Sequence, residues 1–207
     1  MKNLKKYKVI LWDFDGVILD SMPVRELGFR KVLESYPKDA VEKLIQFHHR
    51  NGGWSRYVKF RYFFEKILEV PVKQEMIDEL CGEFSVIMLE LLSSKDLLIN
   101  DSLDFIKKNS SFQEMHIVSG SDQIELRKLC HQLEIAHHFK SISGSPTPKT
   151  ELVNNLLKIL PFESSELVLI GDSKNDLEAA NLNGIDFIGY NNMDLQMENE
   201  YIHSFSK

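Results

Sequence analysis

Short apolar runs that stop at small or acidic residues recur along the chain and predict buried strands. The clearest run covers residues 9–12 and ends at the polar segment 13–16. A continuous apolar run of this length is typical of a parallel strand that is buried on both faces. Weaker patterns of the same kind predict four further strands, at 117–118, 139–142, 167–170 and 187–188.

Segments with helical spacing separate the later strands. We expect helices at 122–133, with Asp122 as a candidate N-cap, at 149–160, and at 175–182, where Gly184 would close the helix. Strands that alternate with helices of this size predict a parallel sheet covered by helices on both faces, so the fold class is α/β and Rossmann-like. The tail after residue 191 is polar and predicts no element.

A long helical pattern separates the first strand from the rest of the sheet. It covers about residues 21–94, and Pro37, Gly52-Gly53 and Pro71 divide it into about four helices. The aromatic residues at 60–64 have helical spacing and are expected to form the core of this part. The sequence therefore predicts an α/β domain made of residues 1–19 and 96–207, with an all-helical domain, residues 20–95, inserted into it.

Composition and charge limit the possible partners. The 207 residues carry a net charge of −6, and 43% of them are hydrophobic and 27% charged, which is ordinary for a soluble globular protein. An acidic surface repels nucleic acids and anionic lipids, so we expect neither as a partner. Cys81 and Cys130 lie far apart and are expected to be reduced thiols. No apolar stretch is long enough for a signal peptide or a membrane span, which predicts a cytoplasmic protein.

Polar groups follow three of the predicted strands. Because ligands of open parallel sheets bind beyond the carboxyl ends of the strands, these groups are expected to meet at one edge. Clustered carboxylates repel one another unless they are protonated or share a cation. Oxygen ligands without a matching set of His and Cys favour Mg²⁺ over Zn²⁺. The candidate residues are Asp13, Asp15, Ser119, Gly120, Asp172 and Asp176.

Four segments in this order resemble the motifs of the haloacid dehalogenase-like (HAD) hydrolase superfamily. They are DFDGVILDS at 13–21, IVSGS at 117–121, GSPTPK at 144–149 and GDSKND at 171–176. The helical insertion lies where this family carries its helical C1-type cap. The layout is similar to that of members of the phosphoglycolate phosphatase and beta-phosphoglucomutase type.

The resemblance implies a role for each motif residue. Asp13 would be the nucleophile that forms an aspartyl-phosphate, and Asp15 the general acid and then base, with its backbone carbonyl on the metal. Asp172 would bind Mg²⁺, and Asp176 would bind it or orient the site; the alternative is a helix cap followed by a first-turn acid. Lys149 at a helix start would stabilise the transition state, with Lys140 as a weaker candidate. The phosphate would be held by Gly16, Ser119 and Gly120.

The loop of the helical segment, 48–56, is a candidate for substrate recognition. Trp54 would stack on a sugar ring, and Arg50 or Arg56 would pair with a carboxylate or a second phosphate. The alternative is an ordinary turn between two helices. His48 and His49, like His137 and His138, are expected to be surface residues and not metal ligands.

These observations favour a magnesium-dependent phosphomonoester hydrolase, monomeric or homodimeric, that acts on a small phosphorylated metabolite such as a sugar phosphate. A phosphomutase of the beta-phosphoglucomutase type would use the same motifs and stays open as the alternative. Dehalogenation is disfavoured because the family's dehalogenases lack the acid that is present here as Asp15. Phosphonate hydrolysis would need an amine in the cap; Lys59 and Lys66 could supply it, but the sequence offers no further support for this reaction. A non-catalytic phosphate-binding module is a further alternative.

Overall fold

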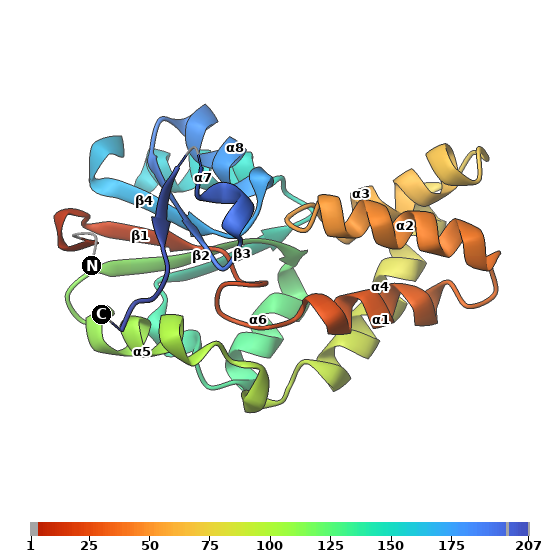
Figure 1. Ribbon diagram of the computed structural model, residues 1–207, viewed down its shortest axis with the longest axis horizontal. Helices are drawn as coiled ribbons and strands as arrows, with labels where there is room; N and C mark the ends of the chain where they lie inside the picture. Colours follow the sequence, from red (N-terminus) through yellow and green to blue (C-terminus); the bar gives the residue numbers. More distant parts are fainter. Residues whose placement is uncertain (1–3, 198, 207) are drawn as a thin grey trace.

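A single six-stranded parallel sheet forms the centre of the protein. The computed structural model describes residues 4–197 and 199–206, and the strand order in the sheet is β3-β2-β1-β4-β5-β6 (Figure 1). The predicted α/β, Rossmann-like fold class is confirmed. The strands are β1 Val9–Trp12, β2 Glu114–Asp122, β3 Ser141–Ser145, β4 Leu167–Gly171, β5 Asp186–Tyr190 and β6 Glu200–Ile202.

Helices cover both faces of this sheet, as expected for parallel strands. Helices α5 (Asn100–Asn109) and α6 (Gln123–Gln132) lie on one face, and α7 (Lys149–Ile159) and α8 (Lys174–Asn183) on the other (Figure 1). Side chains of β1 alternate between the two resulting cores, since Ile10 and Trp12 pack in the first core while Val9 and Leu11 pack in the second. The central strand is therefore buried completely.

The remaining helices form a separate group beside the sheet (Figure 1). Phe29, Phe60 and Phe84 meet at its centre, with ring centroids 4.6–6.1 Å apart. The predicted aromatic core of this part is thus confirmed, and its boundaries at residues 20 and 95 stay a prediction. Its elements are α1 Met22–Val32, α2 Lys38–Arg50, α3 Arg56–Tyr62, the π-helical turn η2 Phe63–Ile67 and α4 Gln74–Leu91.

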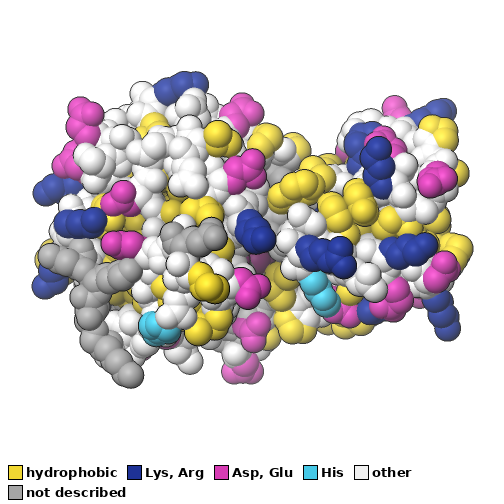
Figure 2. Space-filling view, turned by 45° about the horizontal axis from the view of Figure 1, so that its top comes forward, with side chains coloured by type: hydrophobic (Ala, Val, Ile, Leu, Met, Phe, Trp, Pro, Cys, Tyr) yellow, Lys and Arg dark blue, Asp and Glu magenta, His cyan; other side chains and the backbone are white. Residues whose placement is uncertain are grey.

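The chain passes between the two parts through two neighbouring segments, 18–20 and 97–99, which we call the neck. The amide of Asp20 donates to the carbonyl of Leu97 over 2.8 Å, and the amide of Ile99 donates to that of Ile18 over 2.9 Å. Figure 2 shows the boundary between the parts as a waist, on which hydrophobic side chains reach the surface. Within the described residues, none of the helices has the length and apolar character needed to cross a membrane.

Several predicted elements have different bounds in the structure. β2 continues through 119–121, where a turn was expected, because Asp122 still pairs with Ser145 of β3. β3 begins at Ser141 and not at Phe139, which belongs to the preceding loop. Helix α5 was not predicted. Strand β6, which lies in the polar tail, was not predicted either. Cys81 and Cys130 are both free and buried, as the prediction of reduced thiols allows.

Candidate active site

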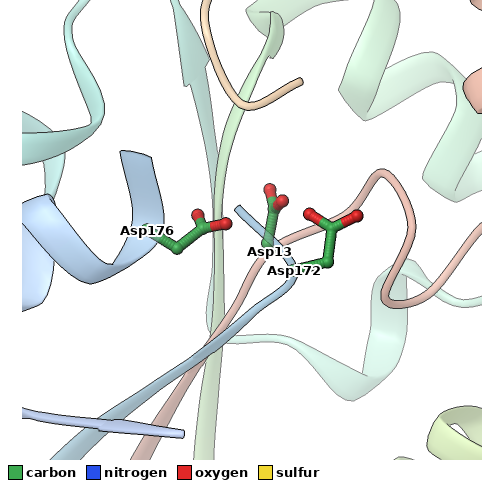
Figure 3. A group of neighbouring side chains, drawn as sticks. All are labelled: Asp13, Asp172 and Asp176. Atoms are coloured by element: carbon green, nitrogen blue, oxygen red, sulfur yellow. The ribbon is translucent and has the colours of Figure 1, made fainter. Parts of the chain in front are cut away.

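Three carboxylates from distant parts of the chain meet at the carboxyl end of the sheet. Asp13 follows β1, Asp172 follows β4, and Asp176 lies in the first turn of α8 (Figure 3). β1 and β4 are neighbours, and the amide of Asp13 donates to the carbonyl of Ile170 over 2.9 Å. One oxygen from each of the three carboxylates lies within 4.8 Å of the others. The predicted convergence of these acids at one edge is therefore found in the structure.

Gly16 lets the loop after β1 approach this cluster closely. Its φ of +76° lies in the left-handed region, and a Cβ built on it would be 2.0 Å from Oδ2 of Asp172. Two side chains beyond β5 hold the same loops, since Asn191 donates to the carbonyl of Gly16 over 2.9 Å and Asn192 to that of Asp172 over 2.7 Å. These asparagines were not predicted, because the sequence around them carries no motif.

Lys149 is the cation inside the cluster. It begins α7 as predicted, is buried, and its Nζ lies 2.8 Å from Oδ1 of Asp13 and also pairs with Asp176. Burial alone would lower the pKa of Lys149, but the two carboxylates raise it, so the group stays charged. The other oxygen of Asp176 accepts from the amide and the hydroxyl of Ser173. Both oxygens of Asp176 are thus occupied.

Ser173, and not Asp172, caps helix α8. Its Oγ accepts from the amide of Asp176 while Asp176 accepts from the amide of Ser173, which makes a reciprocal capping box. The alternative interpretation of Asp172 as the helix cap is therefore wrong. The Asp172 side chain points instead toward Asp13 and has no hydrogen-bond or ion-pair partner among the residues that the structure describes.

Negative charge is in excess at this edge. Burial and the charge of Asp176 raise the pKa of Asp13 to about 7, although Lys149 opposes this effect, and burial and the charge of Asp13 raise the pKa of Asp172 well above its usual value. Three carboxylates face one ammonium group, so a cation with a preference for oxygen would relieve the repulsion. The residues thus fit a divalent metal ion, with Asp13 and Asp172 as its side-chain ligands.

Asp15, two residues after Asp13, is held by three donors. Its Oδ1 accepts from Ser21 over 2.5 Å and from Nε of Arg25 over 2.7 Å, and its Oδ2 accepts from Ser121 over 2.5 Å. Burial would raise the pKa of Asp15, but Arg25 and the two hydroxyl groups outweigh burial and lower it. Asp15 is therefore ionised in this state.

Glu125 of α6 connects this network to the helical segment. Its Oε1 lies 3.1 Å from Nη1 of Arg25, and its Oε2 lies 2.5 Å from Nη1 of Arg56. The three side chains are 0%, 7% and 3% exposed, respectively. Neither Arg25 nor Glu125 was predicted to belong to the site. The available signal was their place on the buried stripes of α1 and α6, where a charged residue needs a partner.

The loop between α2 and α3 covers the site at the carboxyl end of the sheet. Gly53 approaches the sheet so closely that a Cβ on it would be 2.4 Å from Oγ of Ser173, and a Cβ on Gly120 would be 2.3 Å from the carbonyl of Gly53. The cavity beneath is narrow and partly open to solvent. Its wall includes Asp13, Asp15 and Asp172 from the sheet side and Trp54, Arg56 and Lys59 from the helical side.

The structure places the remaining predicted residues at different distances from this cavity. Gly120 lines it, while Ser119 is buried next to it and its Oγ accepts from the amide of Ser121. Arg50 is exposed at the end of α2 and is not among the lining residues, so the structure gives its predicted role no support. The prediction of His48 as a surface residue is wrong. It is fully buried because it continues the apolar stripe of Leu44 and Ile45 on α2.

Comparison with known proteins agrees with this arrangement. The sequence model of the family described as Haloacid dehalogenase-like hydrolase matches residues 10–190. A Phosphoglycolate phosphatase of Colwellia psychrerythraea is 22% identical over 193 residues, covering 90% of this chain and 85% of that protein. A Phosphorylated carbohydrates phosphatase of Thermotoga maritima is 25% identical over 188 residues, covering 87% and 83%.

Solved structures of low sequence identity share the fold. CbbY from Rhodobacter sphaeroides, in complex with phosphate, superposes with a TM-score of 0.77 at 13% identity, covering 97% of this chain and 96% of that one. Beta-phosphoglucomutase from Clostridium difficile gives a TM-score of 0.76 at 16% identity, covering 96% and 92%. The family match spans most of the chain and includes the acids gathered in the site, so the chain belongs to the haloacid dehalogenase-like hydrolase family and is an enzyme of its phosphatase type.

Proposed function

We propose that the protein is a magnesium-dependent phosphomonoester hydrolase that acts on a small phosphorylated metabolite, a sugar phosphate or a related organic phosphate, through an aspartyl-phosphate on Asp13. One observation carries this proposal. The carboxylate of Asp13 lies in the wall of the cavity, between the ammonium of Lys149 and the carboxylate of Asp172, which has no partner among the described residues. The relatives named as phosphatases of small phosphate esters support it.

The charge balance explains why Mg²⁺ is the proposed metal. Asp13, Asp172 and the backbone carbonyl of Asp15 supply hard oxygen ligands, which Mg²⁺ prefers, and no set of His and Cys among the described residues competes with them. When bound, the ion neutralises the negative charge on the phosphate oxygens that would otherwise repel the nucleophile. Asp176 has both oxygens engaged, so we assign it the positioning of Lys149 and not direct coordination.

The reaction then proceeds in two steps, in which residues of the chain have different roles. An oxygen of Asp13 attacks phosphorus, the bond to the ester oxygen breaks, and Lys149 stabilises the charge that develops on the phosphoryl group. In the second step Asp15 takes a proton from the water that attacks the aspartyl-phosphate, which releases inorganic phosphate and restores Asp13. The donors around Asp15 lower its pKa, so the carboxylate is ionised and free to accept that proton. In the first step the protonated form of Asp15 donates its proton to the leaving oxygen, which produces the carboxylate that the second step needs.

Release of phosphate from p-nitrophenyl phosphate tests the proposal. The native protein should release it with Mg²⁺ and stop when a chelator removes the metal. Asp13→Asn should lower turnover by at least about 10³-fold while the circular dichroism spectrum stays native. Asp104→Asn, which removes a carboxylate from the exposed side of α5, is the matched control and should keep full activity.

Two results would contradict the proposal. Metal-bound native protein without turnover would indicate a binding module, and turnover that survives Asp13→Asn would exclude Asp13 as the nucleophile. The alternative of a phosphomutase predicts a different activity, namely isomerisation of a sugar phosphate that depends on a bisphosphate activator, which a separate assay with the sugar phosphate measures.

A further inference from the structure

A second groove lies at the end of the sheet opposite to the carboxylate cluster. It has a volume of about 600 Å³ and is formed by the second half of α6, the turn η4 (Ala136–His138) and the start of β3. We call it the β3 groove. Because all strands are parallel, the start of β3 lies at the amino end of the sheet, whereas Asp13 and Asp172 follow the carboxyl ends of their strands. The β3 groove and the cavity around Asp13 have no lining residue in common among the described residues.

Two cations in the wall of the β3 groove have no acid to pair with. Arg127 and Lys140 line the groove, and neither forms an ion pair within the part of the chain that the structure describes. Glu134 also lines the groove, but its carboxylate already pairs with Lys95. The groove thus has two positive charges that no described residue balances, although the chain as a whole has a net charge of −6. A local excess of this sign attracts anions to the groove.

Arg127 is held in an orientation that suits an anionic ligand. Its Nε donates to the carbonyl of Ile142 over 3.1 Å, which fixes the plane of the guanidinium group. Nη1 and Nη2 of Arg127 have no acceptor among the residues described by the structure. A guanidinium group presents these atoms as a planar fork, which matches two oxygens of a phosphate group. Because the group is already oriented, less conformational entropy is lost when the ligand binds.

The rest of the β3 groove offers apolar and flat surfaces. Phe139 and Ile142 line it and are largely buried, so they form its floor. The ring of His137 lines the wall and packs on the ring of His138, with the ring centroids 4.0 Å apart. Nδ1 of His138 lies 3.0 Å from Oγ of Ser110, so the ring that supports His137 is itself held in place. Ligand sites commonly combine such an apolar surface with a few polar groups in fixed positions.

The charge and the size of the groove limit the class of ligand. A phosphate monoester carries roughly 1.5 to 2 negative charges near neutral pH, which balances Arg127 and Lys140. Inorganic phosphate would supply this charge but would leave the apolar floor uncovered. Pockets of about 300–1,000 Å³ typically hold small organic molecules, and the β3 groove lies in this range.

We propose that the β3 groove binds a small phosphate monoester that carries a flat ring and has the size of a nucleoside monophosphate. Arg127 and Lys140 bind its phosphate group, and its ring lies on Phe139 and Ile142 beside His137. This site is separate from the catalytic one, so the inference does not depend on the proposed phosphatase function.

Calorimetric titration of the native protein tests the site. The probes are adenosine 5′-monophosphate, adenosine and inorganic phosphate, and a chelator removes the metal so that no metal-dependent turnover occurs. The monophosphate should bind about tenfold or more tightly than either of the other two, because only it offers both the charge and the ring. Equal affinity for adenosine would overturn the role of the two cations, and equal affinity for inorganic phosphate would overturn the role of the ring.

Hydrogen exchange followed by mass spectrometry locates the bound ligand. Adenosine 5′-monophosphate should slow amide exchange in residues 127–142, which contain the lining of the β3 groove. Protection confined to residues 13–21 and 171–176 would mean that the probe binds at the active site alone, and it would overturn the proposal.

Two double variants of equal net charge separate a site from general attraction. Arg127→Gln with Lys140→Gln should weaken binding of the monophosphate about tenfold or more and leave the affinity for adenosine unchanged. Lys128→Gln with Lys158→Gln removes two exposed cations that do not line the groove, and it should bind almost as the native protein does. Equal losses in the two variants would contradict a local site. If the first variant does not keep the native melting temperature, the exchange pattern of the native protein decides.

Discussion

At the scale of single residues, Glu125 joins the two parts of the molecule. Its fully buried carboxylate holds Arg25 of α1 with one oxygen and Arg56 of α3 with the other. The two ion pairs offset the loss of hydration of this carboxylate only while both cations remain in place. The same carboxylate also keeps Arg56 pointed into the cavity, so stability and recognition depend on one side chain.

Replacing Glu125 by Gln should therefore destabilise the protein strongly. The variant keeps the size of the side chain but leaves two buried guanidinium groups with one carboxylate fewer, and we expect a loss of about 3 kcal/mol in the free energy of unfolding. Urea denaturation measures it. Glu134→Gln, which breaks the exposed pair with Lys95, is the control and should leave the midpoint unchanged. Equal effects of the two substitutions would contradict the bridging role of Glu125.

The sequence contains part of the information on these buried charges. Arg25 lies four residues before Phe29 on the buried side of α1, and Lys59 lies four residues before Phe63. Charges on an apolar stripe predict burial, and they could have been recognised. Their partners could not, because Glu125 lies 100 residues away from Arg25 and meets it only through the packing of α4 and α6. The motif acids were predictable because each follows a strand whose position in the sheet the pattern fixes.

At the scale of elements, the loop between α2 and α3 is fitted to the end of the sheet. Gly53 lies against Ser173 and Asn175 at the start of α8, and no side chain larger than hydrogen fits there without movement. Ser173 is itself held by the capping box with Asp176, so it has little freedom to yield. The close approach of this loop to the start of α8 thus depends on a glycine.

Gly53→Ala should hold the helical segment away from the sheet. The added Cβ would be 2.4 Å from Oγ of Ser173, and we expect kcat/KM to fall by about 10²-fold because the groups above the nucleophile are displaced. Small-angle scattering should show a larger radius of gyration. Gly82→Ala on α4 meets nothing within 4 Å and serves as the control; it should keep activity and gain about 0.5–1 kcal/mol of stability. Native kinetics in Gly53→Ala would exclude a tight closure during turnover.

Asp101 of α5 anchors the C-terminal segment. It accepts from the amide of Phe205 over 2.9 Å, from Ser204 over 2.8 Å and from Tyr190 over 3.2 Å. Burial would raise the pKa of Asp101, but these hydrogen bonds outweigh burial and lower it from the ordinary value of an aspartate. A carboxyl group with a depressed pKa stabilises the fold at neutral pH, and this contribution disappears as the pH falls through the folded-state value.

Acid should therefore release residues 200–206 before the rest of the sheet opens. Hydrogen exchange followed by mass spectrometry should show the loss of protection in this segment as the pH drops below 3.8, and Asp101→Asn should show it already at neutral pH. Asp104→Asn on the exposed side of the same helix should behave like the native protein. Protection that is unchanged in Asp101→Asn would mean that β6 is held by its pairing with β5 alone.

The elements missed by sequence analysis share a physical cause. β6 has three residues in a polar tail, and its strand conformation comes from pairing with β5 and not from a pattern of its own. β2 extends past its apolar residues for the same reason, because β3 offers a partner as far as Asp122. Other elements can be predicted from the sequence alone. They are long helices with a regular apolar stripe, such as α2, and strands that are apolar throughout, such as β1 and β4.

At the scale of the whole molecule, the excess of carboxylates at the sheet end predicts that metal binding stabilises the fold. With Mg²⁺ at about 100 times its dissociation constant, the free energy of unfolding should rise by about 2.7 kcal/mol, visible as a higher melting temperature that a chelator reverses. Asp172→Asn should lose most of this shift, because it removes the carboxylate that has no partner in the described part of the chain. A melting temperature that responds equally in both proteins would place the ion elsewhere.

The paired neck also has a consequence for how such a protein can diversify. The two places where the chain leaves and rejoins the sheet are hydrogen-bonded to each other, so residues 18–20 and 97–99 lie side by side. We expect that a foreign helical segment, or a short hairpin, spliced between these places would leave β1 and the proposed nucleophile Asp13 unmoved. The segment that covers the site could then be exchanged without rebuilding the sheet. Chimaeras with junctions at residues 19 and 98 should keep the reaction of the protein that supplies the sheet and adopt the substrate preference of the protein that supplies the helical segment.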